Sequence, residues 1–438
     1  MPWQEALFLL LGTLVGLLLI GLPVAFAFFA VNILGALIFL GGDIGLLQMV
    51  RNSVTALTNY SLAPIPLFIL MGELLLHTGV AFRAINAIEQ LIARVPGRMP
   101  IVSVVGGTVF AALSGSSMAN TAMLGSALLP EMLRRGYDAR IAMGPIMATG
   151  GIAMLIPPSA LAVLLGSLAG ISISKLLIAG ILPALMLAVL FVGYIIYACV
   201  SDPSRAPQED ASGASGWARY RPFLIDVVPL SIIFIAVIGS LVAGIATPTE
   251  SAALGCVASA LAALGYRALD RRNLQLSLVE TAKVSVMILF IIVASITFAQ
   301  ILAFSGATNG LIALVTDSGL SPFAIVVSMV LVLLFLGCFV DQVSMLMITI
   351  PFFIPLAKAV DIDLLWLGVL YLLTMEISFL TPPFGLLLFV MKGVAPPPIT
   401  LGEVYRAAMP FLLLELLVLA TLMLWPGLST WLPHLLVP

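Results

Sequence analysis

Apolar residues fill this chain in long unbroken runs, and polar residues gather in short stretches between them. Each run lasts about 17–25 residues, the length an α-helix needs to cross the hydrocarbon core of a bilayer. The runs lack the alternation typical of strands in a membrane barrel. The pattern therefore predicts an all-α polytopic membrane protein with about ten transmembrane helices, over residues 5–20, 23–41, 62–78, 140–170, 174–200, 223–242, 248–265, 282–304, 364–391 and 406–432.

Composition agrees with this fold class. The 438 residues are 62% hydrophobic and 9% charged, with a mean hydropathy of +1.23, whereas soluble domains carry about 25% charged residues. The N-terminus has no positive n-region or small-residue cleavage site, so we expect it to be a mature helix. Cys199, Cys256 and Cys338 have no metal-like spacing and predict neither disulfides nor a zinc site.

Two further apolar stretches, 100–130 and 322–356, are each interrupted near the middle by polar residues. Arginines flank the first stretch on both sides, so the positive-inside rule places both of its ends in the cytoplasm. It is therefore expected to be a re-entrant hairpin. The second stretch has acidic flanks and is expected to enter from the outer face. In this topology only Arg51, Lys175 and Lys358 among the lysines and arginines lie outside, and both termini are periplasmic.

The chain then divides into two matching halves, residues 1–200 and 223–438, joined by a polar cytoplasmic linker at 201–222. Each half has three helices, a hairpin and two more helices, of which one is broken by a proline pair at 157–158 or 382–383. Five crossings per half make the second repeat inverted relative to the first. Two inverted repeats with broken helices are typical of secondary transporters.

Four interruptions face one another in this arrangement: the tips at 114–120 and 337–341 and the two proline bends. Unpaired backbone at membrane depth is tolerated only inside protein or beside a wet cavity. Carbonyl and hydroxyl oxygens there suit sodium, and helix N-termini suit an anion. Since no Lys or Arg lies in the predicted midplane, a bound cation would help to offset the charge of an anionic substrate.

Individual acidic residues allow more than one interpretation. Asp341 lies within an apolar hairpin, where an ionisable group is usually functional, although it could instead be the N-cap of the second arm. Glu376 could be a ligand or a structural acid. The serine and asparagine cluster at 114–120 could bind ligands or join helices. For Glu73, Glu131 and Glu250, pairing or helix capping is the favoured interpretation.

Two other classes fit less well. A membrane serine protease needs a basic residue beside its nucleophile, yet the two histidines, His77 and His434, lie near helix ends and the core has no lysine. The chain is therefore not expected to be an enzyme. A passive channel or scaffold would gain nothing from two opposed, ligand-rich hairpin tips.

Six motifs in order resemble one known family. They are "IPLFILMGELL", "LSGSSMANTAMLGSALLPEMLRRGYD", "MLIPPSALAVLLGS", "GIATPTESAALG", "FVDQVSMLMITIPFFIPL" and "EISFLTPPFGLLLFVMKGVAP". The chain resembles the large permease subunit of tripartite ATP-independent periplasmic (TRAP) transporters, of the dicarboxylate type. The resemblance implies an elevator-type symporter of the bacterial cell inner membrane, driven by sodium rather than ATP. It also implies two partners, a small four-helix membrane subunit and a periplasmic binding protein that delivers an organic acid.

The resemblance also implies site residues. One sodium site would use the first tip with the helix before the first proline bend, and a second would use the other tip with the second bend. The implied sodium ligands are Ser114, Gly115, Ser117, Gly150, Gly151, Gly337, Cys338, Asp341 and Thr381. The implied substrate-binding residues are Ser116, Ser117, Asn120, Pro158, Ser159, Thr381 and Pro383. A sodium/dicarboxylate symporter that works without a binding protein is the nearest alternative.

Overall fold

The structure is a computed structural model that describes residues 1–92, 95–114, 116–157, 159–207 and 217–436. All of its regular elements in these ranges are helices. Six of the described helical segments are long and apolar enough to cross a membrane, or seven if the bent pair Ala139–Leu155 and Ala160–Ala169 is one span. The predicted class, an all-α polytopic membrane protein, is confirmed.

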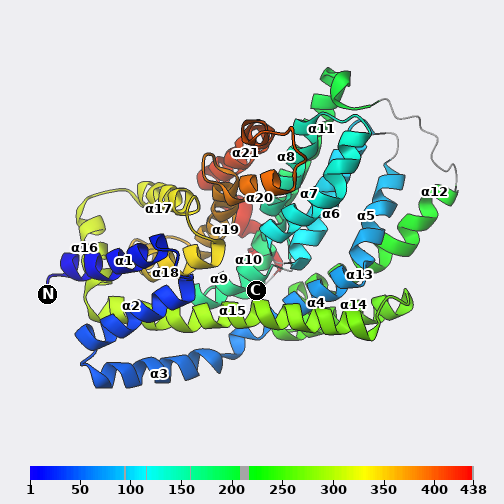
Figure 1. Cartoon of the computed structure of the whole chain (residues 1–438). Coiled ribbons are helices and arrows are strands. Elements are labelled where there is room, and N and C mark those ends of the chain that lie inside the picture. Colours follow the sequence, from blue (N-terminus) through cyan, green and yellow to red (C-terminus); the bar gives the residue numbers. More distant parts are fainter. Residues whose placement is uncertain (93–94, 115, 158, 208–216, 437–438) are drawn as a thin grey trace.

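One group of helices packs around α15 (Arg271–Phe304), the long helix that runs across the lower part of Figure 1. Against α15 lie α2, α3, α4 and α16, and α14 packs between α4 and α13. The bounds in this group are α1 (Trp3–Leu19), α2 (Val24–Phe39), α3 (Asp43–Leu57), α4 (Pro64–His77), α13 (Val228–Val242), α14 (Pro248–Gly265) and α16 (Ala307–Asp317). Next to this group lie α5 (Val80–Leu91) and α12 (Trp217–Pro222).

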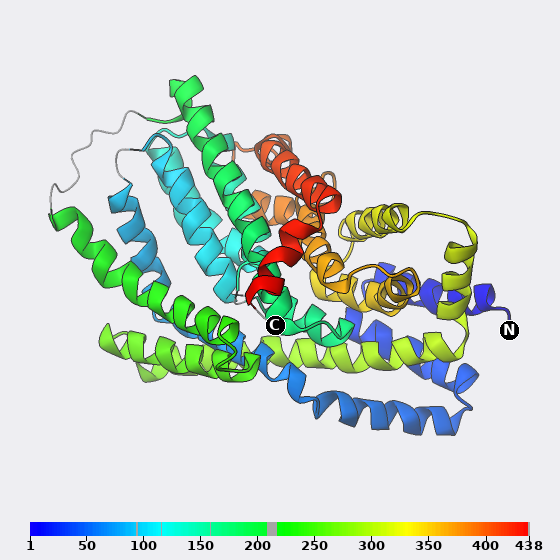
Figure 2. The ribbon, with the colours of Figure 1, turned by 180° about the vertical axis from the view of Figure 1, so that it is seen from behind.

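A second group packs around α8 (Ala139–Leu155), which is buried along almost its whole length because α6, α7, α11, α19 and α21 surround it. Figure 2 shows this group from behind, with α22 near the centre of the molecule. Its other bounds are α6 (Arg98–Ser114), α7 (Ser117–Arg134), α9 (Ala160–Ala169), α10 (Ile173–Ala179), α11 (Ile181–Ser201), α17 (Pro322–Leu336), α18 (Gln342–Ala359), α19 (Leu364–Leu380), α20 (Leu386–Val394), α21 (Leu401–Leu424) and α22 (Gly427–Leu436).

Both interrupted stretches fold as helix–break–helix hairpins. The two ends of the α6–α7 hairpin lie together, since Glu89 of α5 contacts Arg98 at one end, 3.8 Å away, and Arg135 at the other, 2.8 Å away. In the second hairpin, α17 and α18 contact each other and α19. The α8–α9 pair bends by 43° where the first proline bend was predicted, and α19–α20 is interrupted at the second.

The structure repeats the same unit in the two halves. In the first half, the N-cap of α7 is Ser116, the N-cap of α8 is Asp138 and the C-cap of α8 is Ile156. Their counterparts, each 225 positions later, are Asp341, Asp363 and Thr381, which have the same places on α18 and α19. Ile156 and Thr381 even share an extended conformation, with φ of −81° and −80°. The caps of these helices therefore recur at a constant offset of 225 residues, and the division into two inverted repeats stays a prediction.

Several helix bounds differ from the prediction. The hydropathy pattern did not predict α3 or α16, it placed the start of α15 eleven residues too late, and it joined α21 and α22 into one helix. The end of the expected linker is helical, as α12. Helix α3 was missed because it is too polar for a hydropathy run. Its Gln48 donates to Asn52 over 3.0 Å, and Asn52 in turn donates to Gln300 of α15.

Basic residues far apart in the sequence meet at one end of the second group. Arg140, Arg205 and Arg406 line a common small pocket, and the backbone N–H of Asp138 donates to the carbonyl of Arg205 over 3.0 Å. All three arginines were predicted to lie on the cytoplasmic side. Their proximity is what that topology requires.

Candidate functional site

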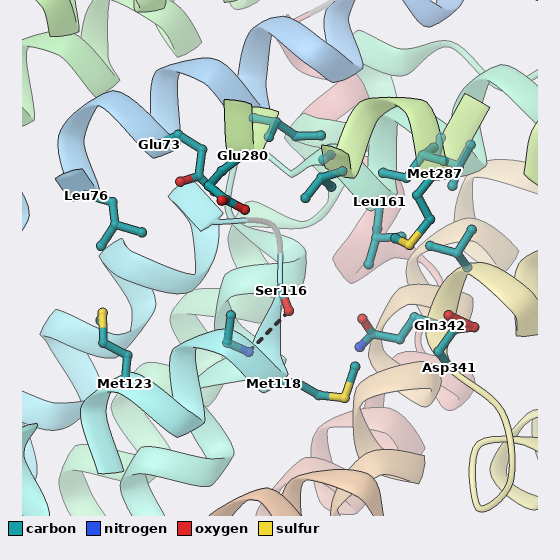
Figure 3. A pocket seen from close by; sticks show the side chains of 17 residues that line it. Glu73, Leu76, Ser116, Met118, Met123, Leu161, Glu280, Met287, Asp341 and Gln342 are labelled. Carbon is teal, nitrogen blue, oxygen red and sulfur yellow. Dashed lines mark hydrogen bonds between the residues drawn. The ribbon is translucent and has the colours of Figure 1, made fainter. Parts of the chain in front are cut away.

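A cavity of about 460 Å³ lies between the two hairpin tips, α9 and the two helices α4 and α15. Most of its lining is apolar, as in small-molecule sites generally. Its polar lining residues are few: Glu73, Ser116, Glu280, Asp341 and Gln342. Figure 3 shows Glu73 and Glu280 near each other on one side, away from Gln342 and Asp341.

Three helices begin at this cavity. The first turns of α7, α9 and α18 contribute Met118, Leu161 and Val343 to its lining. The first N–H groups of a helix have no intrahelical partner and carry partial positive charge. These N-termini therefore suit a carboxylate.

Hydroxyl and carboxylate side chains cap the three N-termini differently. Ser116 accepts from Ala119 N–H over 3.2 Å on α7, and Ser159 accepts from Ala162 N–H over 3.2 Å on α9. Asp341 accepts from Ser344 N–H over 2.9 Å on α18. The negative cap offsets the dipole of α18, so the anion-binding potential is concentrated at α7 and α9.

Behind the cavity, Glu376 of α19 joins the two hairpin tips. Its Oε2 accepts from the Ser117 hydroxyl over 2.8 Å and from Gln342 Nε2 over 2.7 Å. Ser117 and Gln342 are counterparts in the 225-residue repeat, so the same position of each hairpin binds one carboxylate atom. Glu376 is fully buried, and a movement of either tip relative to α19 would change its hydrogen bonds.

Gly150 and Gly151 of α8 make room for two buried carboxylates. A Cβ at Gly150 would lie 1.7 Å from Glu376 Oε1, and one at Gly151 would lie 2.6 Å from Glu415 Oε1. Glu415 of α21 is fully buried, and neither of its oxygens has a hydrogen-bond partner among the described residues. Close approach of an acid explains why these two positions have no side chain.

A buried amide supports the first tip from the other side. Asn120 Nδ2 donates to Thr149 Oγ1 over 3.0 Å, which ties α7 to α8 just before the glycine pair. Its Oδ1 is buried and lacks a partner in the described part of the chain. This hydrogen bond shows that one residue of the 114–120 cluster joins two helices, which was one of the two interpretations of that cluster.

The second tip packs against the end of α19. A Cβ at Gly337 would lie 1.8 Å from Ser378 Oγ, and Thr381 donates its hydroxyl to the Ile377 carbonyl over 2.8 Å. Cys338 lies in the turn after α17, 3.6 Å from the Leu334 carbonyl. The Pro383 carbonyl accepts from the Tyr405 hydroxyl over 2.7 Å.

The structure thus places the predicted residues in two layers. Ser116 and Asp341 line the cavity. Among the described residues, the other predicted ligands are outside its lining and lie at the tips, the glycine pair and the bends: Ser117, Asn120, Gly150, Gly151, Ser159, Gly337, Cys338, Thr381 and Pro383. Gly115, Pro158 and the side chain of Ser114 lie outside the described part. Each role in binding stays a prediction.

Sequence reasoning missed Glu280, Gln342 and Glu415, and treated Glu73 only as a pairing residue. Glu73 does pair with His77, 3.1 Å away, but it also lines the cavity. The structural interpretations of Glu131 and Glu250 are confirmed, since Glu131 pairs with Arg134 and Arg135 and Glu250 completes a capping box. Gln342 could have been found as the neighbour of Asp341, whereas Glu415 stands alone in an apolar run.

Two hairpins whose tips meet at a cavity beside a broken helix are typical of a polytopic secondary transporter. The chain belongs to the DctM family, because residues 11–428 match the family described as "Tripartite ATP-independent periplasmic transporter, DctM component". It is a TRAP transporter large permease subunit.

Related proteins match this chain over most of its length. The chain is 34% identical to the C4-dicarboxylate TRAP transporter large permease protein DctM of Pseudomonas aeruginosa, over 86% of this chain and 87% of that protein. It is 29% identical to the ectoine TRAP transporter large permease protein TeaC of Halomonas elongata, over 98% and 99%. The solved structure of the YdaH transporter of Alcanivorax borkumensis matches with a TM-score of 0.64 at 14% identity, over 88% and 89%, and shows the fold alone.

Proposed function

We propose that this large permease subunit carries out sodium-coupled uptake of a small organic acid, a C4-dicarboxylate or another carboxylate. A periplasmic binding protein would deliver the acid, and a separate small four-helix subunit would accompany the permease in the bacterial inner membrane. The observation that carries the proposal is the convergence of three helix N-termini on one cavity. Two of these N-termini have neutral serine caps and suit a carboxylate.

Sodium coupling is supported by the second layer of residues. Helices α8 and α19 each end at a bend, where some of the last C=O groups of a helix have no backbone N–H donor within that helix. Backbone carbonyls at a helix C-terminus, with nearby hydroxyls, suit a hard cation. The proposed sodium sites therefore stay at the first tip with Gly150 and Gly151, and at the Gly337–Asp341 tip with Thr381.

The two groups of helices support an elevator mechanism. The hairpins and broken helices around α8 would move as one body against α4, α14 and α15, carrying the cavity across the membrane. The packing of α8 inside five other helices favours rigid movement of this group. Opposite orientation of the two repeats, with both termini periplasmic, would give the two hairpins access to opposite sides.

The test is uptake into proteoliposomes that contain this chain and the small subunit. Pooled labelled organic acids are offered with the binding protein, with and without an inward sodium gradient. Accumulation that requires both the gradient and the binding protein supports the proposal. Uptake that is independent of the binding protein supports the alternative, an ordinary sodium/dicarboxylate symporter. No uptake with a substrate-loaded binding protein contradicts both.

A further inference from the structure

The cavity between the hairpin tips is electrically two-sided. On the side of α7 and α9, helix N-termini present N–H groups. On the opposite wall, α4 and α15 contribute two carboxylates, Glu73 and Glu280, which lie near each other in Figure 3. A dicarboxylate has a negative group at each end, so one of its ends would face this acidic wall.

The two acids line the same side of the cavity and lie near each other in Figure 3, so their negative charges repel. Each has one basic neighbour on its own helix, His77 at 3.1 Å from Glu73 and Lys283 at 2.7 Å from Glu280. Neither basic residue is among the described residues that line the cavity, and the described lining includes no Lys or Arg. The wall that a substrate would meet is therefore acidic.

Gln342 gives an independent indication of the same polarity. Gln342 is only 7% exposed, and its Nε2 donates a hydrogen bond to Glu376. A carboxylate can accept only from the amide nitrogen, so the orientation of the amide is fixed and the oxygen is left as an acceptor. Gln342 also lines the cavity. Its amide oxygen can therefore accept a hydrogen bond from a donor on a ligand.

We propose that the substrate is a zwitterion, a small carboxylic acid that also carries an ammonium, amidinium or similar cationic nitrogen group. Its carboxylate lies at the N-termini of α7 and α9. Its cationic group lies against Glu73 and Glu280, and an N–H on that group donates to Gln342 Oε1. This inference rests on the proposed function and names the substrate class within it. The acidic wall would reject dianions by leaving two like charges together.

The test measures ligand binding to the purified permease with its small subunit at a fixed sodium concentration, by thermal stabilisation. The zwitterionic probes are ectoine, β-alanine and γ-aminobutyrate, and the dianionic probes are succinate, fumarate and malate. We expect stabilisation by at least one zwitterion and by none of the dianions. Stabilisation by a dianion, or by none of the six compounds, would overturn the inference.

Variants then locate the effect. Glu280→Gln and Glu73→Gln should each weaken zwitterion binding about tenfold, as expected for loss of one charge contact. Glu5→Gln, the same change on α1 away from the cavity, should leave binding unchanged. Equal affinity in all three variants would contradict the proposed position of the cationic group. Loss of stabilisation by sodium alone in Glu73→Gln would show instead that the wall binds the coupling ion.

This experiment can fail separately from the proposed function. Zwitterion binding without sodium-driven uptake would contradict the transport proposal and leave the charge inference intact. Sodium-driven uptake of a dicarboxylate would support the transport proposal and contradict the charge inference.

Discussion

At the scale of single residues, carboxylates and glycines fit together at the centre of the molecule. Gly150 and Gly151 lie against Glu376 and Glu415, and Glu376 in turn receives hydrogen bonds from both hairpin tips. The sequence alone raised Glu376 as a possible ligand because it precedes the second proline bend. It could not identify Glu415, whose contact with Gly151 joins positions 264 residues apart and leaves no local pattern.

Gly150→Ala should abolish most of the sodium-driven uptake. The added methyl carbon would meet Glu376 Oε1 at 1.7 Å and Ser117 Oγ at 2.8 Å, so the carboxylate must move and its bond to Ser117 must break. Overpacking of this kind costs about 1–3 kcal/mol of stability. The matched control is Gly193→Ala on α11, where a Cβ meets nothing within 4 Å. Equal uptake rates in the two variants would contradict a role for this close contact.

Glu415→Met should raise the melting temperature of the detergent-solubilised protein. Both carboxylate oxygens are buried without partners among the described residues, and an apolar side chain of similar volume avoids the desolvation of an unpaired acid. The gain should reach about 1–3 kcal/mol. A lower melting temperature would mean that the acid has a stabilising ligand that the side-chain geometry does not include.

At the scale of elements, the hairpins and broken helices were predictable because polar residues and proline pairs interrupt apolar runs that otherwise suit lipid. Their details were not. The tie between Asn120 and Thr149 depends on how α7 packs against α8, and periodicity carries no such information. Helix α3 was missed because its stabilising contacts are polar and lie on α15, nearly 250 residues further along the chain.

Asp341→Asn separates the two roles considered for this hairpin acid. Asparagine is as good an N-cap as aspartate, so the melting temperature should stay unchanged. The charge is lost, so the sodium concentration for half-maximal uptake should rise about tenfold. Asp363→Asn is the control. Asp363 caps α19 in the same way, because its carboxylate accepts a hydrogen bond from Leu365 N–H over 2.7 Å. It lies outside the lining of the cavity. An unchanged sodium dependence for Asp341→Asn would leave capping as its whole role.

At the scale of the whole molecule, equivalent positions in the two halves are separated by a constant offset of 225 residues. Ser117 and Gln342 occupy equivalent places and converge on Glu376, whose own counterpart is Gly151. One half thus provides the acid and the other provides the space beside a second acid, Glu415. An internal repeat was predictable from the paired proline motifs, but this asymmetry inside the repeat was visible only in the packed structure.

Inversion of the repeats gives a prediction for the intact protein in its membrane. Arg134 and Lys358 stand before α8 and α19, the equivalent central helices of the two halves, and both positions are exposed. If the halves are inverted, these positions lie on opposite sides of the membrane. In a variant without Cys199, Cys256 and Cys338, a cysteine at position 358 should react with an impermeant maleimide on intact spheroplasts. A cysteine at position 134 should react only after permeabilisation, since the arginines around it place it in the cytoplasm. The cysteine-free parent controls for background labelling. Reaction of both positions from the same side would mean that the repeats are parallel. In that case the two hairpins could not open to opposite faces of the membrane.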